Sequence, residues 1–256
     1  MKRSCKKPKI SIITTVLNDR NNLEQTIQSV IEQTYPNFEY IIIDGGSTDG
    51  TIDVIKKYEK NISFWLSEPD KGISDAFNKG IKIANGDYIN FQGAGDFLYD
   101  KQVLSKMMDN VHMDSDWLIC GKVQRVTESG KVLWTTPSSF HKTSLLFKMS
   151  LPHQALFTHK KFFYKYGQFD TQLKFSMDYD LILRSYHCFP GVKMKNHIVS
   201  CWREGGVGTN RFMEIFKEYN LIKKKNKVAS YFKLFLIHHW ILLKYRLSKH
   251  FIKKGK

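Results

Sequence analysis

A single carboxylate, Asp96, follows an apolar run and a short glycine-rich turn near the middle of the chain. Residues 88–91 have the pattern of a buried strand, and the small residues at 93–95 leave room for a bulky charged ligand to approach the backbone. A nucleoside diphosphate that holds a divalent cation would fit beside such a carboxylate. The same four residues, GAGD, are also typical of an ordinary strand-ending turn, so the neighbouring motifs decide between the two interpretations.

A second candidate site is the segment DGGSTDGT at residues 44–51, which joins an apolar run to a helical pattern. Flexible glycines and the free N–H groups at a helix start can together hold a nucleotide. Ser47, Thr48 or Asp49 would also serve as the helix N-cap, whether or not a ligand binds. Capping does not require Asp44. Because Asp44 follows four apolar residues, we expect it to be exposed at the sheet edge, where it would accept a hydrogen bond from a base N–H.

Two acids, Asp178 and Asp180, open a helical pattern late in the chain. Acidic residues are favoured at this position by the helix dipole alone. If the helix lies across the same sheet edge, one of them could accept the proton of an attacking hydroxyl while a cation near Asp96 takes charge off a leaving diphosphate. Their spacing leaves open whether they face Asp96.

Two further positions are weaker candidates. His153 and Gln154 precede a short strand pattern, and a lone histidine is more often structural than catalytic. Arg203 lies in the glycine-rich segment 202–208. This segment either closes over a diphosphate or forms an ordinary exposed loop.

The elements that must position these residues alternate along the first part of the chain. We expect strands at 9–17, 38–43, 62–67 and 88–91, with helices at 23–33, 52–59 and 73–84. This order predicts an α/β fold with a mainly parallel sheet and helices on both faces. Ligands in such sheets bind beyond the carboxyl ends of the strands, where Asn18, Asp44, Asp70 and Asp96 fall.

The later part of the chain is less regular. A helix near 103–111 and strands at 117–126 and 132–135 suggest an inserted antiparallel element. A short strand at 156–158 and helices at 160–166 and 177–186 follow.

Composition restricts the function further. The chain has 256 residues, a net charge of +16 and 42% hydrophobic residues, enough for a sizeable core. Residues 1–9 carry five Lys/Arg and no acid, residues 211–256 carry thirteen against two acids, and residues 10–210 carry 22 of each sign. Because the body is neutral, we do not expect a nucleic-acid partner.

Location is predicted from the cysteines and the N-terminus. The four cysteines are far apart and form no metal or redox motif, which favours a reducing compartment. The apolar segment after the basic start is too short and too polar for a signal peptide, so a cytoplasmic location is expected.

Taken in order, these motifs resemble the family 2 inverting glycosyltransferases with the GT-A fold, particularly bacterial enzymes that extend surface polysaccharide repeat units. The resemblance covers about residues 10–208 and rests on SIITTVLND, IIIDGGSTDGT, EPDKGISDAFNKGIKIANGDYI, GAGD, HQALF and FDTQLKFSMDYDLILR. It implies a GT-A, Rossmann-like domain over residues 1–210, with a nucleotide-sugar half at about 10–98 and an acceptor half at about 99–210.

The resemblance also implies roles for individual residues. Thr15, Asn18, Asp44, Gly46 and Ser47 would bind the nucleotide, Asp70 and Lys71 the uridine and diphosphate side, Asp75 the sugar, and Asp96 the cation, Mg²⁺ or Mn²⁺. Arg203, beside its glycine-rich segment, is a candidate contact to the diphosphate. Asp178 would be the general base that deprotonates an acceptor hydroxyl for in-line attack with inversion. His153, Gln154 and Asp180 are further candidate contacts to acceptor or diphosphate.

Two positions depart from the family pattern. Gly95 stands where many relatives carry an acid, so that Asp96 is the one carboxylate left at the end of this strand. We therefore expect a cation held largely by the donor diphosphate and water, and weak metal binding by the donor-free protein. Met177 replaces a frequent Glu but leaves Asp178 in place.

The basic segment 211–256 is expected to be an amphipathic helical tail. Its apolar stretch, residues 231–243, is interrupted by Lys233, His238 and His239 and is too short to span a bilayer comfortably. A helix lying on an anionic membrane surface would account for both the apolar and the basic residues. The alternative is a helix packed on the body or on another subunit, which leaves a homodimer open.

The expected function is transfer of a hexose or N-acetylhexosamine from a nucleotide sugar, with UDP as the expected carrier, to a hydroxyl of a lipid-linked (undecaprenyl diphosphate) oligosaccharide. The setting would be O-antigen, capsule or lipopolysaccharide assembly, on the inner face of the cytoplasmic membrane. The alternatives are a polyprenyl-phosphate sugar transferase, which HQALF and FDTQLKF disfavour, and a non-catalytic sugar-nucleotide or nucleic-acid binding protein. Retention of Asp44, Asp96 and Asp178 argues against the non-catalytic alternative.

Overall fold

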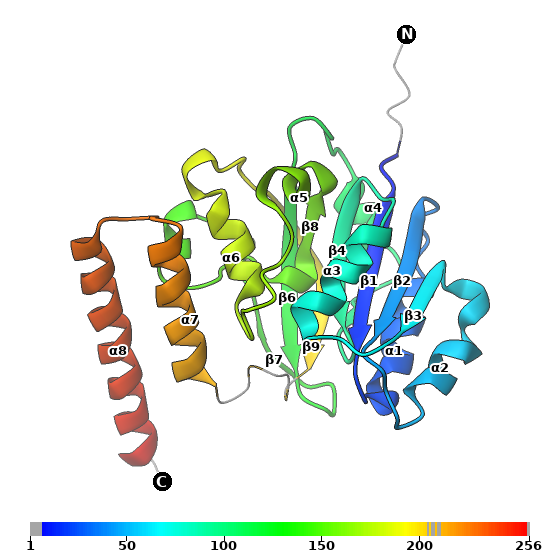
Figure 1. Ribbon diagram of the computed structural model, residues 1–256, viewed down its shortest axis with the longest axis horizontal. Helices are drawn as coiled ribbons and strands as arrows, with labels where there is room; N and C mark the ends of the chain where they lie inside the picture. Colours follow the sequence, from blue (N-terminus) through cyan, green and yellow to red (C-terminus); the bar gives the residue numbers. More distant parts are fainter. Residues whose placement is uncertain (1–6, 204, 206–207, 209–210, 255–256) are drawn as a thin grey trace.

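The computed structural model describes residues 7–203, 205, 208 and 211–254 (Figure 1). Its first half alternates strands and helices as the sequence predicts. These elements are β1 (Ile10–Val16), α1 (Arg20–Ile31), β2 (Phe38–Asp44), α2 (Thr51–Lys57), a 3₁₀ turn (Glu59–Asn61), β3 (Phe64–Ser67), α3 (Ile73–Ile83) and β4 (Tyr88–Gly93). The ends of the predicted elements differ from the observed ones by only a few residues.

The four strands form a parallel sheet in the order β3-β2-β1-β4, with β1 in the centre. Every residue of β1 is buried, including Ser11, Thr14 and Thr15, as expected of a parallel strand covered on both faces. Because crossovers between parallel strands are right-handed, α1 and α2 cover one face of this sheet and α3 covers the other (Figure 1). A Cβ added at Gly80 of α3 would lie 2.5 Å from Ile13 of β1, so glycine allows this helix to pack closely on the sheet.

The second half extends the same sheet through β8, β6, β9 and β5. Its elements are β5 (Phe97–Leu98), α4 (Val103–Met108), β6 (Leu118–Val126), β7 (Val132–Thr135), two 3₁₀ turns (Lys142–Leu146 and His153–Ala155), β8 (Leu156–His159), α5 (Lys160–Tyr166), α6 (Met177–Arg184), a 3₁₀ turn (Tyr186–Cys188) and β9 (Lys193–Arg203). The predicted antiparallel pairing of the strands now seen as β6 and β7 is confirmed.

Two strands of this half were not predicted. β9 carries three basic residues among its first five positions, which hides its strand pattern, and β5 is only two residues long. β9 pairs with β6 in parallel and with β5 in the antiparallel direction, so the whole sheet is mixed although mainly parallel.

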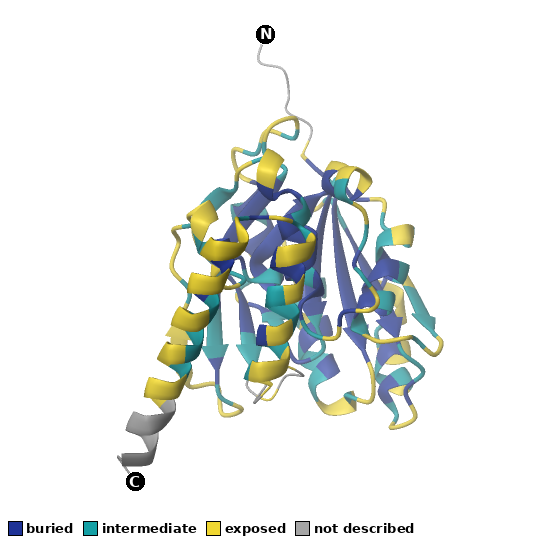
Figure 2. Ribbon diagram, turned by 60° about the vertical axis from the view of Figure 1, so that its left-hand side comes forward, coloured by how far each residue is buried: buried dark blue, intermediate teal, exposed yellow. Residues whose placement is uncertain are grey.

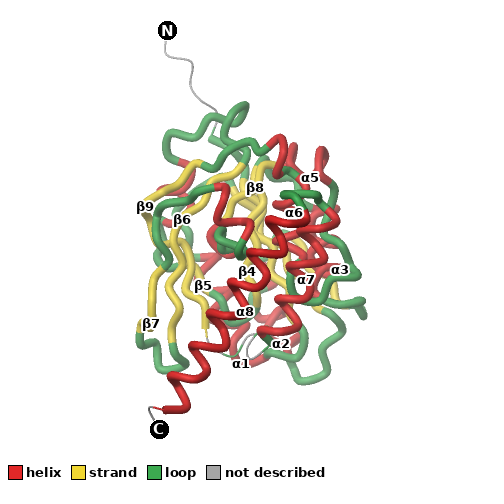
Figure 3. Tube along the Cα trace, turned by 90° about the vertical axis from the view of Figure 1, so that its left-hand side faces the viewer, coloured by secondary structure: helices red, strands yellow, loops and turns green. Residues whose placement is uncertain are grey.

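The segment expected to be one helical tail is two helices, α7 (Phe212–Lys225) and α8 (Tyr231–Lys254). α7 packs against α6, and α8 packs on the outer side of α7. Seen from the α8 side of the molecule, α3, α6 and α7 all lie on the same side of the strands (Figure 3). Most of α8 is exposed, whereas the central strands are buried (Figure 2). Within the described part of the chain, no helix is apolar enough over a sufficient length to cross a membrane.

Candidate active site

A cavity of about 890 Å³ lies at the carboxyl edge of the parallel strands, a size suited to a small-molecule ligand. Strand ends β1 and β4, the starts of α1 and α3, and the segments around 153, 173 and 203 form its wall. The predicted site residues that line it are Thr15, Asp70, Lys71, Asp96, His153, Gln154 and Arg203. The remaining predicted residues do not line it: Asn18, Asp44, Gly46, Ser47, Asp75, Asp178 and Asp180.

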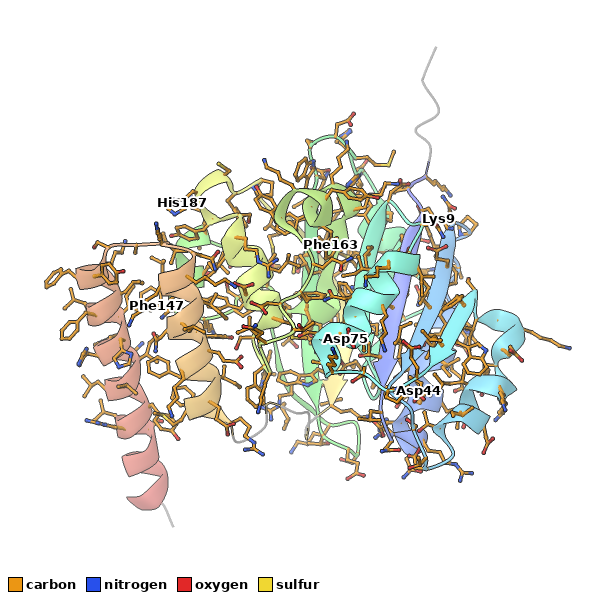
Figure 4. The ribbon with its side chains drawn as sticks, viewed as in Figure 1. Lys9, Asp44, Asp75, Phe147, Phe163 and His187 are labelled. Atoms are coloured by element: carbon orange, nitrogen blue, oxygen red, sulfur yellow. The ribbon has the colours of Figure 1, made fainter. Side chains whose placement is uncertain are left out.

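Asp44 ends β2, but the expectation that its carboxylate is exposed is wrong. The residue is fully buried. Its oxygens accept hydrogen bonds from the N–H groups of Gly46 and Ser47 and from the hydroxyls of Ser47 and Ser67. Figure 4 shows Asp44 at the lower end of β2, the end at which the cavity lies. In the donor-free structure Asp44 therefore shapes the loop after β2, and direct contact with a base stays a prediction.

Asn18 and Ser47 join the loops that follow β1 and β2. The Asn18 N–H donates to the Ser47 hydroxyl at 2.7 Å, and the Asn18 side-chain oxygen accepts from the Thr48 N–H at 2.9 Å. The predicted N-cap of α2 is wrong. Gly50, with a φ of 91°, occupies that position, while the Asp49 carboxylate accepts from the N–H and hydroxyl of Thr51.

Asp70 and Lys71 line the cavity from the loop before α3. A Cβ added at Gly45 would lie 2.5 Å from Asp70 Oδ2, so the absence of a side chain at Gly45 lets Asp70 lie against this loop. Asp75 accepts from the Lys71 N–H at 3.1 Å and lies 3.8 Å from Lys79 Nζ. Asp75 thus orders the turn that carries Lys71, and its predicted sugar contact stays a prediction.

Asp96 lies in the cavity wall with only 8% of its surface exposed. Gln154 Nε2 donates to Asp96 Oδ2 at 3.2 Å. The Thr26 hydroxyl donates to the Asp96 carbonyl at 2.7 Å and accepts from the Gly95 N–H, which holds the turn against α1. Burial raises the pKa of Asp96 to about 6, although the positive charge of His153 and the Gln154 hydrogen bond oppose the shift.

His153 lies near both Asp178, the predicted base, and Asp96, the predicted cation ligand. Its Nδ1 lies 3.6 Å from Asp178 Oδ2, an ion-pair distance longer than a hydrogen bond. Burial lowers the pKa of His153, but the nearby carboxylates of Asp178 and Asp96 outweigh it and raise the pKa overall. His153 is therefore an electrostatic link between Asp96 and Asp178. The start of α6 reaches the cavity through Met177, and the role of Asp178 as a base stays a prediction.

Asp180 was predicted to contact the acceptor or the diphosphate, but it does not line the cavity. It is fully buried on the other side of α6. Its Oδ2 pairs with the Arg184 guanidinium, and its Oδ1 accepts from Asn226 Nδ2 at 3.1 Å. Asp180 therefore connects α6 to the end of α7, and its partners leave no carboxylate oxygen facing a substrate.

Arg203, at the end of β9, lines the cavity and is fixed to α1. Its guanidinium donates to Asn22 Oδ1 at 2.8 Å and also to Gln25 Oε1. It further lies over the Phe97 ring, 5.8 Å from the ring centre. Glu204, Gly206 and Val207 of the glycine-rich segment lie outside the described residues, so the predicted closure of that loop stays a prediction.

Several functional neighbours were missed from the sequence. Asn90 and Gln92 lie inside β4 and donate to the Gln154 carbonyl at 3.1 and 2.8 Å, which places the His153–Gln154 turn beside Asp96. The signal in the sequence was the presence of two amide side chains inside an otherwise apolar strand, because buried amides need hydrogen-bond partners. Asp19 also lines the cavity, and its Oδ2 lies 3.9 Å from the Cβ position of Gly95.

α7 also supports the cavity. The Glu218 carboxylate accepts from the N–H groups of Lys174, Phe175 and Ser176 at 2.8, 3.1 and 2.9 Å. Residues 171–175 line the cavity, as does Ile215 of α7. α8 is therefore the helix of the pair that best fits the expected tail, because α7 also forms part of the cavity wall.

The residues at Asp96 fit a cation with few protein ligands. Among the described residues, no group of three or more His, Cys, Asp or Glu side chains could hold a metal ion. Asp96 nevertheless is a buried carboxylate at a cavity wall whose burial favours its neutral form, and a cation would offset that cost. Such a site suits Mg²⁺ or Mn²⁺ bound mainly by a ligand's phosphates.

Comparison with solved structures defines the class of fold. Staphylococcus aureus TarS (residues 1–349, in complex with UDP-GlcNAc) superposes with a TM-score of 0.70 at 15% identity, over 91% of this chain and 71% of that one. The mannosyltransferase PcManGT from Pyrobaculum calidifontis, in complex with GDP-Man and Mn²⁺, gives 0.66 at 15% identity, over 88% and 66%. The fold is that of the GT-A glycosyltransferases.

Sequence comparison then identifies the family. Residues 11–179 match the model of glycosyl transferase family 2. The PGL/p-HBAD biosynthesis glycosyltransferase Rv2957 of Mycobacterium tuberculosis is 32% identical over 184 residues, 70% of each chain. A Bacillus subtilis protein whose name assigns it provisionally to teichuronic acid biosynthesis is 38% identical over 106 residues, 40% of this chain and 42% of its own. The chain belongs to glycosyl transferase family 2.

Proposed function

We propose that this chain transfers a hexose or N-acetylhexosamine from a nucleotide sugar to a hydroxyl of a lipid-linked glycan, with inversion at the anomeric carbon. The observation that carries the proposal is that Asp96 and His153 line the cavity beyond the strand ends while Asp178, behind the wall, lies 3.6 Å from His153. UDP is the proposed carrier, supported by the UDP-GlcNAc complex of TarS. The GDP-Man complex of PcManGT makes GDP the first alternative to test.

The cavity wall suggests where the donor would lie. Thr15 and Asp70 would contact the nucleoside, with Asn18, Asp44, Gly46 and Ser47 holding the loops around it. Lys71 and Arg203 would neutralise the diphosphate, and Asp75 would reach the sugar. A Mg²⁺ or Mn²⁺ ion at Asp96 would stabilise charge on the departing diphosphate.

Asp178 is the proposed general base. The acceptor hydroxyl oxygen would attack the anomeric carbon as its proton passes to an Asp178 carboxylate oxygen. The bond from that carbon to the diphosphate oxygen breaks, and its electron pair leaves with the nucleoside diphosphate. Protonated His153 would orient Asp178 and add positive charge near the leaving group.

The acceptor is proposed to be membrane-linked, with the protein cytoplasmic and peripheral on the inner face of the cytoplasmic membrane. The names of the Mycobacterium and Bacillus relatives, which refer to PGL/p-HBAD and teichuronic acid biosynthesis, support a glycan-building role with such an acceptor. The exposed apolar and basic surface of α8 supports membrane attachment.

The first experiment is a thermal-shift screen of the full chain with UDP-, GDP- and dTDP-sugars, with and without Mn²⁺. A ligand that binds only the folded protein raises its melting temperature. We expect a metal-dependent rise with one nucleotide class, followed by slow hydrolysis of that sugar without acceptor. If no nucleotide sugar raises the melting temperature, the proposed donor site is refuted.

Asp178→Asn tests the base directly. We expect turnover to fall by about 10²–10⁴-fold, the usual contribution of a positioned base, while the donor-induced thermal shift is retained. Asp53→Asn is the matched control, because Asp53 is an exposed acid in the first turn of α2. Equal turnover by both variants would exclude Asp178 as the base.

A further inference from the structure

A second cavity, of about 560 Å³, lies between α7 and α8. It is separate from the proposed donor site, because the two cavities share no lining residue. Its wall consists of Asn220, Lys223 and Lys224 from α7 with Tyr231, Phe232, Leu234, Phe235, His238 and His239 from α8. The wall contains two lysines and two histidines and no acidic residue.

Lys223 is the unusual member of this wall. Only 1% of its surface is exposed, and Nζ has no hydrogen-bond partner among the described residues. An unpaired buried amine is costly, so native proteins normally provide such a group with a partner. Burial also lowers the pKa of Lys223 to about 8. The missing partner points to an anion that is bound when the protein is in its working environment.

The charged groups near Lys223 also favour an anion. Lys224 lies beside it on α7, and His238 and His239 approach from α8. Burial, followed by the charges of His239, Lys223 and Lys224, lowers the pKa of His238. Neighbouring α6 carries two acids, and both have other partners. Asp180 pairs with Arg184 and lies 3.9 Å from Lys225, and Asp178 lies 3.6 Å from His153. Asn220 Nδ2 lies 3.0 Å from His238 Nδ1, which adds a neutral polar group to the wall.

The rim of the cavity is apolar and continues along α8. Phe232 and Phe235 line the cavity and are strongly exposed. Leu236, Trp240, Leu243 and Leu247 follow at helical spacing, and each of the six is at least 48% exposed. We call these six residues the α8 stripe. A ligand with an anionic head and an apolar chain would match both the basic interior and this rim.

We propose that the α7–α8 cavity binds the phosphate group of a membrane lipid, with the Lys223 ammonium as its central donor and the α8 stripe against the acyl chains. A phosphate monoester carries up to two negative charges near neutral pH and offers several acceptor oxygens. This inference deepens the proposed membrane attachment and rests on it. It does not depend on the sugar-transfer reaction.

The test uses the full chain and soluble dihexanoyl phosphatidic acid, with binding followed by calorimetry at pH 7. Lys223→Met removes the ammonium but keeps the length of the side chain. We expect at least a tenfold loss of affinity. Lys217→Met is the matched control, because Lys217 is an exposed lysine of the same helix outside the cavity wall. The control should bind like the wild type. Equal binding by Lys223→Met and wild type would overturn the proposal.

Two further measurements keep the test decisive if Lys223→Met folds poorly. In the wild type, affinity for the soluble lipid should fall about tenfold per pH unit above about 8, because only the ammonium form of Lys223 binds the phosphate. An affinity that is constant from pH 7.5 to 9.5 would contradict this. Inorganic phosphate should bind much more weakly than the lipid. Equal affinity for both would overturn the assignment to a lipid.

Vesicles separate this proposal from the membrane attachment on which it rests. Wild type should bind vesicles of phosphatidylcholine with added phosphatidic acid more tightly than phosphatidylcholine alone, and Lys223→Met should lose most of that preference. If Lys223→Met keeps the full preference, only the cavity assignment fails. If the wild type binds neither vesicle, the membrane attachment fails and this proposal fails with it.

Discussion

The Asp96 carboxylate is buried, and burial makes its negative charge unfavourable. Burial moves its pKa from 3.8 to about 6, and with about 1.4 kcal/mol per unit the charged form costs about 3 kcal/mol at neutral pH. Such a cost is typical of a residue kept for function. A cation bound to the ionised carboxylate would offset it.

Asp96→Asn should therefore separate stability from function. Native Asp96 retains its proton to a higher pH than the unfolded chain does, so the wild type loses stability as pH rises from about 4 to 6. The variant lacks this loss and should be up to about 3 kcal/mol more stable above pH 6, while losing the metal-dependent thermal shift with donor. Urea unfolding at pH 4 and pH 7 measures the difference. A variant less stable than wild type at pH 7 would contradict the proposed burial cost.

Asp178 and Asp180 show what residue types alone leave undecided. Both are acids in the first turn of α6, and the helix dipole favours both. An α-helix turns by about 100° per residue, so these two side chains leave the helix on nearly opposite sides. Asp178 therefore approaches His153, whereas Asp180 is buried against Arg184.

At the scale of elements, α7 acts as a support for the cavity. Its Glu218 carboxylate receives three backbone N–H groups from residues 174–176, next to the cavity wall. Those N–H groups belong to the three residues just before α6, the last of them its N-cap, where helical partners are absent. The position of Asp178 thus depends on a helix far away in sequence.

Glu218→Ala should loosen this loop. We expect a loss of about 1–3 kcal/mol in stability, because three backbone donors lose a charged acceptor, together with a lower kcat/KM. Glu214→Ala is the control on the same helix, since Glu214 pairs only at the surface with Arg211. Its effect should be within about 1 kcal/mol. Urea unfolding and donor kinetics compare the two variants, and similar losses in both would refute the supporting role.

At the scale of the whole molecule, α7 joins the sheet domain to α8, which carries the surface proposed to face a membrane. α7 contacts α6 on one side and α8 on the other. The apolar α8 stripe is therefore presented at the outside of the molecule, where Figure 2 shows most of α8 exposed. A membrane-bound acceptor would be brought close to the protein by this surface.

Leu236→Ser with Trp240→Ser tests this attachment without changing charge or the cavity wall. Each exposed side chain should contribute about 1 kcal/mol or more on entering the interface, so the pair should weaken binding to phosphatidylglycerol vesicles about tenfold or more. Tyr99→Ser with Tyr164→Ser is the control, because both tyrosines are exposed elsewhere on the surface. Vesicle sedimentation at low and high salt measures the effect. Equal binding by the two double variants would refute attachment through α8.

The sequence by itself determined the alternation of strands and helices, the parallel character of the first half of the sheet and the family. These depend on local apolar periodicity and on short motifs, which a single chain displays directly. The strand β9 was hidden because its first residues are basic and only its partners β6 and β5 stabilise it.

Only the tertiary structure decided which polar groups share the cavity. Asp44 was expected at the surface and is buried, because nearby N–H groups and hydroxyls surround its carboxylate. Asn90 and Gln92 place His153 from a strand that is far away in sequence, and Lys223 is buried where α8 packs on α7. Burial and side-chain direction arise from contacts between distant segments, and local patterns carry no record of those contacts.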